Sequence, residues 1–314
     1  MHFSLFTAGF VIFLSTPLTT ALKIASATNT IEYTPELIAI KDYYKSDANI
    51  VNGGVANIVS DTSIDLAANA ETQALRQYAN HKNLRIIYTV AEVYYRIIAN
   101  AKGVSTIKDL KGKKIGTMPG TSAAYFVQKY MTSAGFKDSD YTVVTGNICM
   151  SAPCGAGTLP YMLQHGSIDA FGMWEPTAQL AIEAMGTNAV VLQDRSVYRE
   201  IFNLHSTSNK LKDPATRKNI VAFLKALIQS ENDYLNKPDS VQPRAASALN
   251  MNAAVLKDAW PVHAWNNGTL PADLLDVLVE EDQWVAKQDR RTAMSRDVLK
   301  DLIDSSVLEE ALRS

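Results

Sequence analysis

The stretch Gly116-Thr-Met-Pro-Gly-Thr-Ser-Ala-Ala-Tyr-Phe126 joins the end of a predicted strand to the start of a predicted helix through a glycine turn. The first turn of a helix leaves backbone N–H groups unpaired, and such groups bind anions. With Gly120 and the hydroxyls of Thr121 and Ser122, this helix start is a candidate anion site. Ordinary capping of the helix by Thr121 or Ser122 is the alternative. The stretch has neither Gly-x-Gly-x-x-Gly nor a P-loop lysine, which disfavours a nucleoside triphosphate.

Around this stretch, short apolar runs alternate with segments of helical periodicity. The expected strands cover residues 114–118, 141–145, 168–173 and 189–192, and the expected helices cover 107–110, 123–133, 158–165 and 176–185. Strands and helices that alternate at these lengths indicate an α/β unit.

The residues before this unit show the same alternation. Strands are expected at 22–27, 50–51, 64–67 and 84–90, and helices at 34–44, 55–59 and 71–78. The run Leu84–Val90 is largely apolar, which is typical of a parallel strand covered on both faces. From Asp213 onward the pattern is helical only, with helices expected at 218–235, 238–250, 253–259, 270–288 and 296–312.

These segments predict an α/β protein with two lobes. Residues 22–105 form the first part of lobe 1, residues 106–200 form lobe 2, and residues 201–314 return to lobe 1 and end in a helical C-terminal region. Because no flexible Gly/Ser linker separates these parts, we expect short crossovers between the lobes, which suits a hinge.

The charge balance disfavours two classes of partner. The chain has 314 residues, of which 30 are basic and 32 are acidic, and its formal net charge is −2. Such a balance gives no electrostatic reason to expect nucleic acid or an anionic membrane as the main partner.

Residues 1–21 are predicted to be a signal peptide. Phe3 to Leu14 is an apolar run too short to cross a bilayer, and small residues follow it up to Ala21. The front of the segment departs from the usual pattern, because His2 stands where Lys or Arg is common; a short first strand or helix of the fold is the alternative. We expect a secreted protein, periplasmic or extracellular, with no transmembrane segment in the mature chain.

The chain has two cysteines, Cys149 and Cys154. In a secreted protein, a pair this close predicts a disulfide that closes a small loop, with two free thiols or half of a metal site as alternatives. No second Cys/His cluster appears, so no metal is expected. Asn267-Gly-Thr269 is a glycosylation sequon, which matters in a eukaryotic secretory route. The chain also lacks Gly-x-Ser-x-Gly and His-Glu-x-x-His, and we assign no catalytic residue.

Further candidate ligand-binding residues lie at predicted strand ends, where α/β sheets place ligands. Arg96 has forked donors that suit a carboxylate or sulfonate, or it is a surface ion-pair partner. Trp174 is a candidate pocket wall and Glu175 a candidate acceptor; a core tryptophan and a helix-capping glutamate are the alternatives. Other polar residues in such loops are candidate contacts or helix caps: Thr28, Asn29, Asn69, Glu71, Thr72 and Tyr94.

In this order, the motifs resemble the SsuA/THI5-like (NMT1-like) group of type 2 periplasmic binding proteins. The resemblance covers Leu22 to about Leu204, and the helical tail from Asp213 carries no motif of the group. It rests on Ile107-Lys-Asp-Leu-Lys-Gly-Lys-Lys-Ile-Gly116, Gly120-Thr-Ser122, Leu159-Pro-Tyr-Met-Leu-Gln-His-Gly-Ser-Ile-Asp169 and Trp174-Glu-Pro176.

The resemblance implies two lobes that trap a ligand between them. Members bind alkanesulfonates, taurine, nitrate-like anions or thiamine-precursor pyrimidines, and in sulfonate binders the helix start that matches Thr121-Ser122 tends to hold the anionic head. We therefore expect a monomeric, non-enzymatic solute-binding protein without a cofactor, with an ABC permease as a candidate partner.

Two alternatives to this expectation stay open. The pyrimidine-synthesising branch of the group is enzymatic, intracellular and cysteine-rich. With only Cys149 and Cys154 behind a predicted signal peptide, the sequence disfavours that branch. A secreted interaction protein on this fold, in a eukaryotic setting without a permease, is the second alternative.

Overall fold

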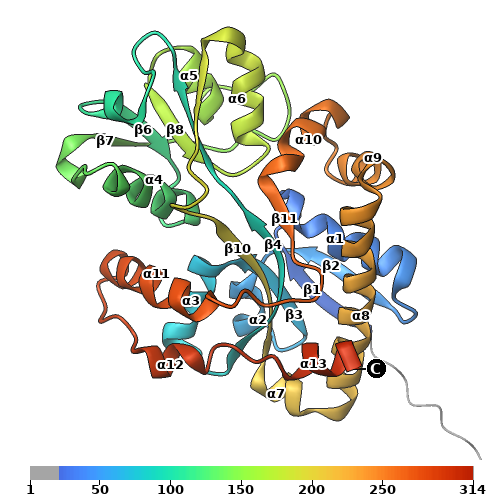
Figure 1. Cartoon of the computed structure of the whole chain (residues 1–314). Helices are drawn as coiled ribbons and strands as arrows, with labels where there is room; N and C mark the ends of the chain where they lie inside the picture. The colour runs from blue at the N-terminus through green and yellow to red at the C-terminus, as the bar shows by residue number, and fades with distance from the viewer. Residues whose placement is uncertain (1–20, 314) are drawn as a thin grey trace, which may run out of the picture.

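The computed structural model describes residues 21–313, which form two α/β lobes, each built on one β-sheet (Figure 1). We call the lobe with the six-stranded sheet lobe 1 and the other lobe 2. This architecture confirms the predicted two-lobed α/β fold. Among the described residues, no helix is long and apolar enough to cross a membrane. The predicted signal peptide, apart from Ala21, lies outside the described residues.

The sheet of lobe 1 has the strand order β11-β4-β10-β3-β1-β2. In it β1 pairs in parallel with β2 and β3, whereas β10 is antiparallel to both of its neighbours. The strands are β1 (Leu22–Ser26), β2 (Ala48–Asn52), β3 (Leu66–Ala70), β4 (Leu84–Val93), β10 (Glu200–Thr207) and β11 (His263–Trp265).

The prediction of a parallel strand at Leu84–Val90 is wrong. Strand β4 is nearly fully buried, as expected, but it is antiparallel to both β10 and β11. A continuous apolar run indicates that both faces of a strand are covered, and it does not determine the direction of the neighbouring strands.

The sheet of lobe 2 has the order β7-β6-β8-β5-β9. The chain crosses between the lobes twice, from β4 to β5 and from β9 to β10. It therefore enters the second sheet at Arg96, ahead of the boundary expected at residue 105. The strands are β5 (Arg96–Asn100), β6 (Lys114–Thr117), β7 (Thr142–Thr145), β8 (Ala170–Met173) and β9 (Ala189–Leu192).

Helices cover both sheets. Lobe 2 holds α4 (Ser122–Ser133), α5 (Leu159–Gln164) and α6 (Thr177–Met185). The other helices pack mainly on lobe 1, and α10 also contacts α6 (Figure 1). They are α1 (Thr34–Ile38), α2 (Val55–Ser60), α3 (Glu71–Asn80), α7 (Ser208–Lys212), α8 (Pro214–Asn236), α9 (Pro238–Ala248), α10 (Ala253–Ala259), α11 (Leu274–Gln288), α12 (Arg296–Lys300) and α13 (Ser306–Arg313).

Two C-terminal segments depart from the helical pattern expected after Asp213. The short strand β11 extends the sheet of lobe 1 beside β4. The single helix expected over 296–312 is interrupted between α12 and α13, because the chain there bonds to the edge of β4. The Ile86 N–H donates to the Leu302 carbonyl at 2.6 Å, and the Asp304 N–H donates to the Ile86 carbonyl at 2.9 Å.

Strand β10 was not expected from the sequence, although it lies in the middle of the lobe 1 sheet. All eight of its residues are buried, and five of them are polar. Their side chains bond to neighbouring strands: the Thr89 hydroxyl donates to Asn203 Oδ1 at 2.7 Å, and the Ser206 hydroxyl donates to the Asp65 carbonyl at 2.9 Å. Internal partners of this kind make burial of polar residues tolerable, and they leave no apolar run for a sequence pattern to detect.

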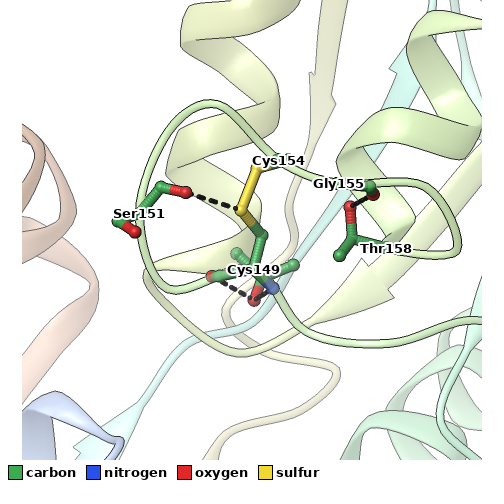
Figure 2. The surroundings of a disulfide bond; sticks show 6 residues. Cys149, Ser151, Cys154, Gly155 and Thr158 are labelled. Atoms are coloured by element: carbon green, nitrogen blue, oxygen red, sulfur yellow. Dashed lines mark hydrogen bonds between the residues drawn. A yellow bond between two sulfur atoms is a disulfide. The ribbon is translucent and has the colours of Figure 1, made fainter.

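The predicted disulfide is confirmed. Cys149 and Cys154 are bonded and close a small loop of lobe 2 (Figure 2). The loop is fixed to α6, because the Cys149 N–H donates to Thr177 Oγ1 at 3.1 Å and the Thr177 hydroxyl donates to the Cys149 carbonyl at 3.0 Å. Both cysteines are therefore engaged with each other, and the two-thiol and metal alternatives are wrong.

Several buried carboxyl groups of this fold favour the protonated form. Glu36 on α1 accepts a hydrogen bond from the Ser26 hydroxyl at 3.1 Å, and burial raises its pKa from 4.5 to about 8. Burial also raises the pKa of four further carboxyl groups: Glu71, Glu200, Glu231 and Glu281. The folded chain therefore binds more protons than the unfolded chain between pH 4.5 and about 8.

We predict that the free energy of unfolding falls as the pH rises from about 5 to about 8, because each pKa unit corresponds to about 1.4 kcal/mol. Glu36→Gln removes one ionisable group, so it should be more stable than the wild type at the upper pH and similar to it at the lower. Urea unfolding at both values measures this. Stability that increases toward pH 8 would contradict the prediction.

Candidate ligand-binding site

A cavity of about 260 Å³ lies where the loops that follow β1 and β3 meet the turn before α4. Pockets that hold drug-sized ligands are roughly 300–1,000 Å³, so this cavity suits a smaller molecule. The cavity is lined by six of the residues that the sequence analysis named as candidates: Asn29, Asn69, Gly120, Thr121, Ser122 and Trp174. Lining residues that the sequence candidates did not include are Ala27, Thr30, Glu32, Ala70, Gln73, Glu200 and Phe202.

The start of α4 holds a carboxyl group of the protein itself. The Ser122 hydroxyl donates to Glu200 Oε2 at 2.9 Å, and the Tyr95 hydroxyl donates to the same oxygen. The Thr121 hydroxyl turns back to the Met118 carbonyl at 2.7 Å, and neither side chain caps the helix. The hydroxyl of Ser122, which the sequence offered to a ligand anion, is therefore bound to Glu200.

The cavity is acidic. Its lining includes the carboxyl groups of Glu32 and Glu200 and no Lys or Arg. Burial, together with the nearby carboxyl groups of Glu32 and Glu71, raises the pKa of Glu200 well above its ordinary value. A bound anion would meet these carboxyl groups with no cationic lining side chain to balance its charge.

Two polar side chains on the cavity wall have unused hydrogen-bonding atoms. Glu32 is 1 % exposed, and neither of its carboxylate oxygens accepts a hydrogen bond from the described residues. The Trp174 indole N–H is also buried, and it finds no acceptor among those residues. Buried polar groups are nearly always hydrogen-bonded, so these atoms are candidate contacts for a ligand. His263 Nε2 lies 3.4 Å from Glu32 Oε1 without making a hydrogen bond to it.

Gly120 brings the two lobes together beside the cavity. Its carbonyl accepts hydrogen bonds from Gln73 Nε2, at 3.2 Å, and from Arg76 Nη1, both of which come from α3 in lobe 1. Its φ of +76° lies in the left-handed region that glycine adopts readily. A Cβ atom at this position would also lie 3.0 Å from Arg76 Nη1.

A larger cavity, of about 910 Å³, lies between α4 of lobe 2 and α11 of lobe 1. Gly120 is the one residue that the two linings share. Two ion pairs join the lobes here: Lys129 Nζ lies 2.9 Å from Glu280 Oε2, and Lys287 Nζ lies 3.7 Å from Asp138 Oδ2. No other candidate residue from the sequence lines this cavity.

Arg96 and Glu175 bond to each other within lobe 2. The Arg96 Nη2 atom lies 2.5 Å from Glu175 Oε1, and both residues are buried. The second oxygen, Oε2, accepts from the Gln179 N–H at 2.9 Å at the start of α6. Arg96 thus neither lines the cavity nor forms a surface ion pair. Glu175 is buried, and its carboxylate also accepts a backbone N–H at the start of α6.

The other four candidates lie off the smaller cavity. Glu71 accepts from the Tyr198 hydroxyl at 2.8 Å and from the Ile201 N–H at 2.9 Å. The Thr28 hydroxyl donates to Asn52 Oδ1 at 3.0 Å. The guanidinium carbon of Arg195 lies 4.9 Å from the centre of the Tyr94 ring, and Thr72 is fully buried.

The sequon residue Asn267 is half-buried. Its side-chain Nδ2, the atom that a glycan would modify, donates to Asn232 Oδ1 at 2.9 Å, and its backbone N–H donates to Glu231 Oε2 at 2.6 Å. Glycosylation of the folded chain would require the first of these bonds to break.

Two α/β lobes, two crossovers and a small cavity between the lobes define a protein of the periplasmic-binding-protein type. The family model described as NMT1/THI5 like matches residues 41–241, and the chain belongs to this family. A search of the curated proteins found no match.

Solved structures share this fold at low sequence identity. The ligand-binding component of an ABC-type import system from Staphylococcus aureus has a TM-score of 0.72 at 13 % identity, over 94 % of this chain and 99 % of that one. The aliphatic sulphonate binding protein SsuA from Escherichia coli has a TM-score of 0.69 at 17 % identity, over 88 % and 91 %. The desulfurization enzyme DszB has a TM-score of 0.63 at 12 % identity, over 93 % and 99 %.

A variant of Arg96 tests whether this residue stabilises the fold or binds the ligand. We predict that Arg96→Met lowers the free energy of unfolding by about 3–5 kcal/mol, because it leaves a buried carboxylate without its partner. The double variant Arg96→Met/Glu175→Gln should recover part of this loss, and urea unfolding measures both. Unchanged stability of Arg96→Met, together with lost ligand binding, would instead support the ligand-clamp hypothesis.

Proposed function

We propose that the protein is a secreted, monomeric solute receptor that closes its two lobes on one small ligand. Of the ligand classes considered, a neutral or cationic amino-bearing heterocycle, such as a thiamine-precursor pyrimidine, agrees best with the site. The observation that carries this proposal is the acidic lining of the cavity, in which Glu32 and Glu200 stand without a lysine or arginine.

The polar atoms of the cavity favour a ligand that donates hydrogen bonds from one of its ends. Neither carboxylate oxygen of Glu32 accepts a hydrogen bond from the described residues, and an amino group beside a protonated ring nitrogen can donate to both. The free indole N–H of Trp174 suits an acceptor on the same ligand. Trp174 and Phe202 add aromatic surface for a flat ring.

A sulfonate or another anion agrees less well with these groups. Placing a charge in a buried site is costly unless an opposite charge or sufficient donors balance it. Here the helix-start hydroxyl of Ser122 already donates to Glu200, and no cationic side chain lines the cavity. The anionic ligands expected from the helix start are therefore less favoured than an amino-bearing heterocycle.

The two crossovers between the lobes provide a hinge, and a ligand held by both lobes stabilises the closed form. The predicted signal peptide supports export. The Staphylococcus aureus relative is described as a component of an ABC-type import system, which supports delivery to a permease as the role of this chain.

An enzymatic role is the second candidate, because a desulfurization enzyme has the same fold. In this chain both cysteines form the disulfide, so neither is available as a nucleophile. Mass spectrometry of an aminopyrimidine after incubation with the protein separates the candidates: the binding role requires unchanged ligand, and a new product would establish an enzyme.

We predict that the aminopyrimidine precursor of thiamine raises the melting temperature, whereas taurine and alkanesulfonates leave it unchanged. A ligand at about 100 times its Kd stabilises the folded state by about 2.7 kcal/mol, which corresponds to a rise of roughly 5 °C or more for a chain of this size. Thermal denaturation with each compound measures the effect.

Glu32→Gln is the matched control, since it keeps the shape of the side chain and removes the charge. It should weaken the shift caused by the aminopyrimidine. A shift with taurine and none with the aminopyrimidine would overturn the proposed ligand class.

A further inference from the structure

Two side chains of α3 in lobe 1 meet the turn of lobe 2 at which the two cavities adjoin. Gln73 lines the smaller cavity, and its Nε2 donates to the Gly120 carbonyl at 3.2 Å. Arg76 lies three residues further along the same face of α3, and its Nη1 donates to the same carbonyl. Gly120 is the residue that the two linings share, so both donors bind the chain at the boundary between the cavities.

The guanidinium of Arg76 is held at this boundary. Its Nε lies 3.3 Å from Asp289 Oδ1 at the end of α11, an ion pair without a hydrogen bond at Nε, and the Arg76 side chain is 19 % exposed. A Cβ atom at Gly120 would lie 3.0 Å from Arg76 Nη1 and 3.8 Å from the guanidinium carbon. The guanidinium therefore fills the space beside Gly120 that a side chain at this position would need.

The larger cavity differs in chemistry from the smaller, acidic one. Among the described residues of its lining, the charged side chains pair with one another across the lobes: Lys129 with Glu280 and Lys287 with Asp138. The rings of Tyr125 and Trp284 also line it, with their centres 5.4 Å apart. A second ring of a ligand, above all a cationic ring, suits such an aromatic lining.

We propose that Gln73 and Arg76 are specificity-determining residues, which limit the ligand to a single ring by closing the passage past Gly120 into the larger cavity. This role rests on the proposed function, because it concerns the size of the ligand that the smaller cavity admits. A ligand with a second ring has to displace both donors from the Gly120 carbonyl, and one of these hydrogen bonds is charge-assisted.

Calorimetry with two ligands tests this role. The aminopyrimidine precursor of thiamine has one ring, and thiamine joins a thiazolium ring to the same aminopyrimidine. We expect the wild type to bind the precursor more tightly than thiamine. In Gln73→Ala/Arg76→Ala the boundary is open, so the ratio of thiamine affinity to precursor affinity should rise by about tenfold or more. An unchanged ratio, with both affinities lowered alike, would show that the two side chains only hold the lobes together, and would overturn the inference.

Two variants of α3 are matched controls. Gln77 is on the next turn of the helix and belongs to neither lining, so Gln77→Ala should keep the wild-type ratio. Gln73→Met keeps a side chain of similar length and removes the donor, so it should raise the ratio less than Gln73→Ala does. If the double variant fails to fold, this pair of single variants decides. A ratio raised equally in Gln77→Ala would show a general loosening of α3 and contradict the proposed role.

The same measurements separate this role from the proposed function. Binding of the precursor to the wild type, with an unchanged ratio in the double variant, would leave the proposed function standing and overturn the role of Gln73 and Arg76. If the precursor does not bind, thermal denaturation with aminopyridine and benzyl-aminopyridine replaces it. Stabilisation of the wild type by the single ring alone, and of the double variant by both compounds, would count against the proposed ligand and support the role. The same response of both proteins, or no response in either, would overturn it.

Discussion

The Glu200 carboxyl group, held by the hydroxyls of Ser122 and Tyr95, is the contact on which the site depends. Ser122 opens α4 in lobe 2, Tyr95 lies in the first crossover, and Glu200 begins β10 at the end of the second. One carboxyl group thus ties both crossovers to the helix start that faces the ligand cavity. This carboxyl group also occupies the Ser122 hydroxyl that the sequence offered to a ligand anion, which supports the proposed preference for ligands that donate hydrogen bonds.

This contact requires a sheet that buries polar groups. Strand β10 brings Glu200 to the cavity, and Asn203 and Ser206 further along it have internal hydrogen-bond partners. Burial of this kind raises the pKa of the Glu200 carboxyl group above its ordinary value. The same burial that defines the cleft therefore makes the stability of the protein sensitive to pH in a direction opposite to that of a protein held by surface ion pairs.

Sequence periodicity predicted the two-lobed α/β fold and most helices, because these elements have local apolar patterns. It did not predict β5 or β10, which lie between other strands, and it could not set the direction of β4. For the site, strand-end loops identified six lining residues, since such loops meet at a sheet edge. Glu32 lies in the loop that contains Asn29. Its charge among mostly apolar and uncharged neighbours could have marked it as a candidate site residue. Arg96 and Glu175 were chosen for their chemistry, but tertiary packing pairs them with each other.

The central claim is that the cavity between the lobes selects ligands that donate hydrogen bonds over anionic ligands. Co-crystallisation with an equimolar mixture of taurine and the aminopyrimidine precursor of thiamine tests it most directly. The account predicts electron density for the aminopyrimidine alone, with its amino group at Glu32 and the Glu200–Ser122 bond intact. Density for a sulfonate at the start of α4, with Ser122 turned away from Glu200, would contradict it.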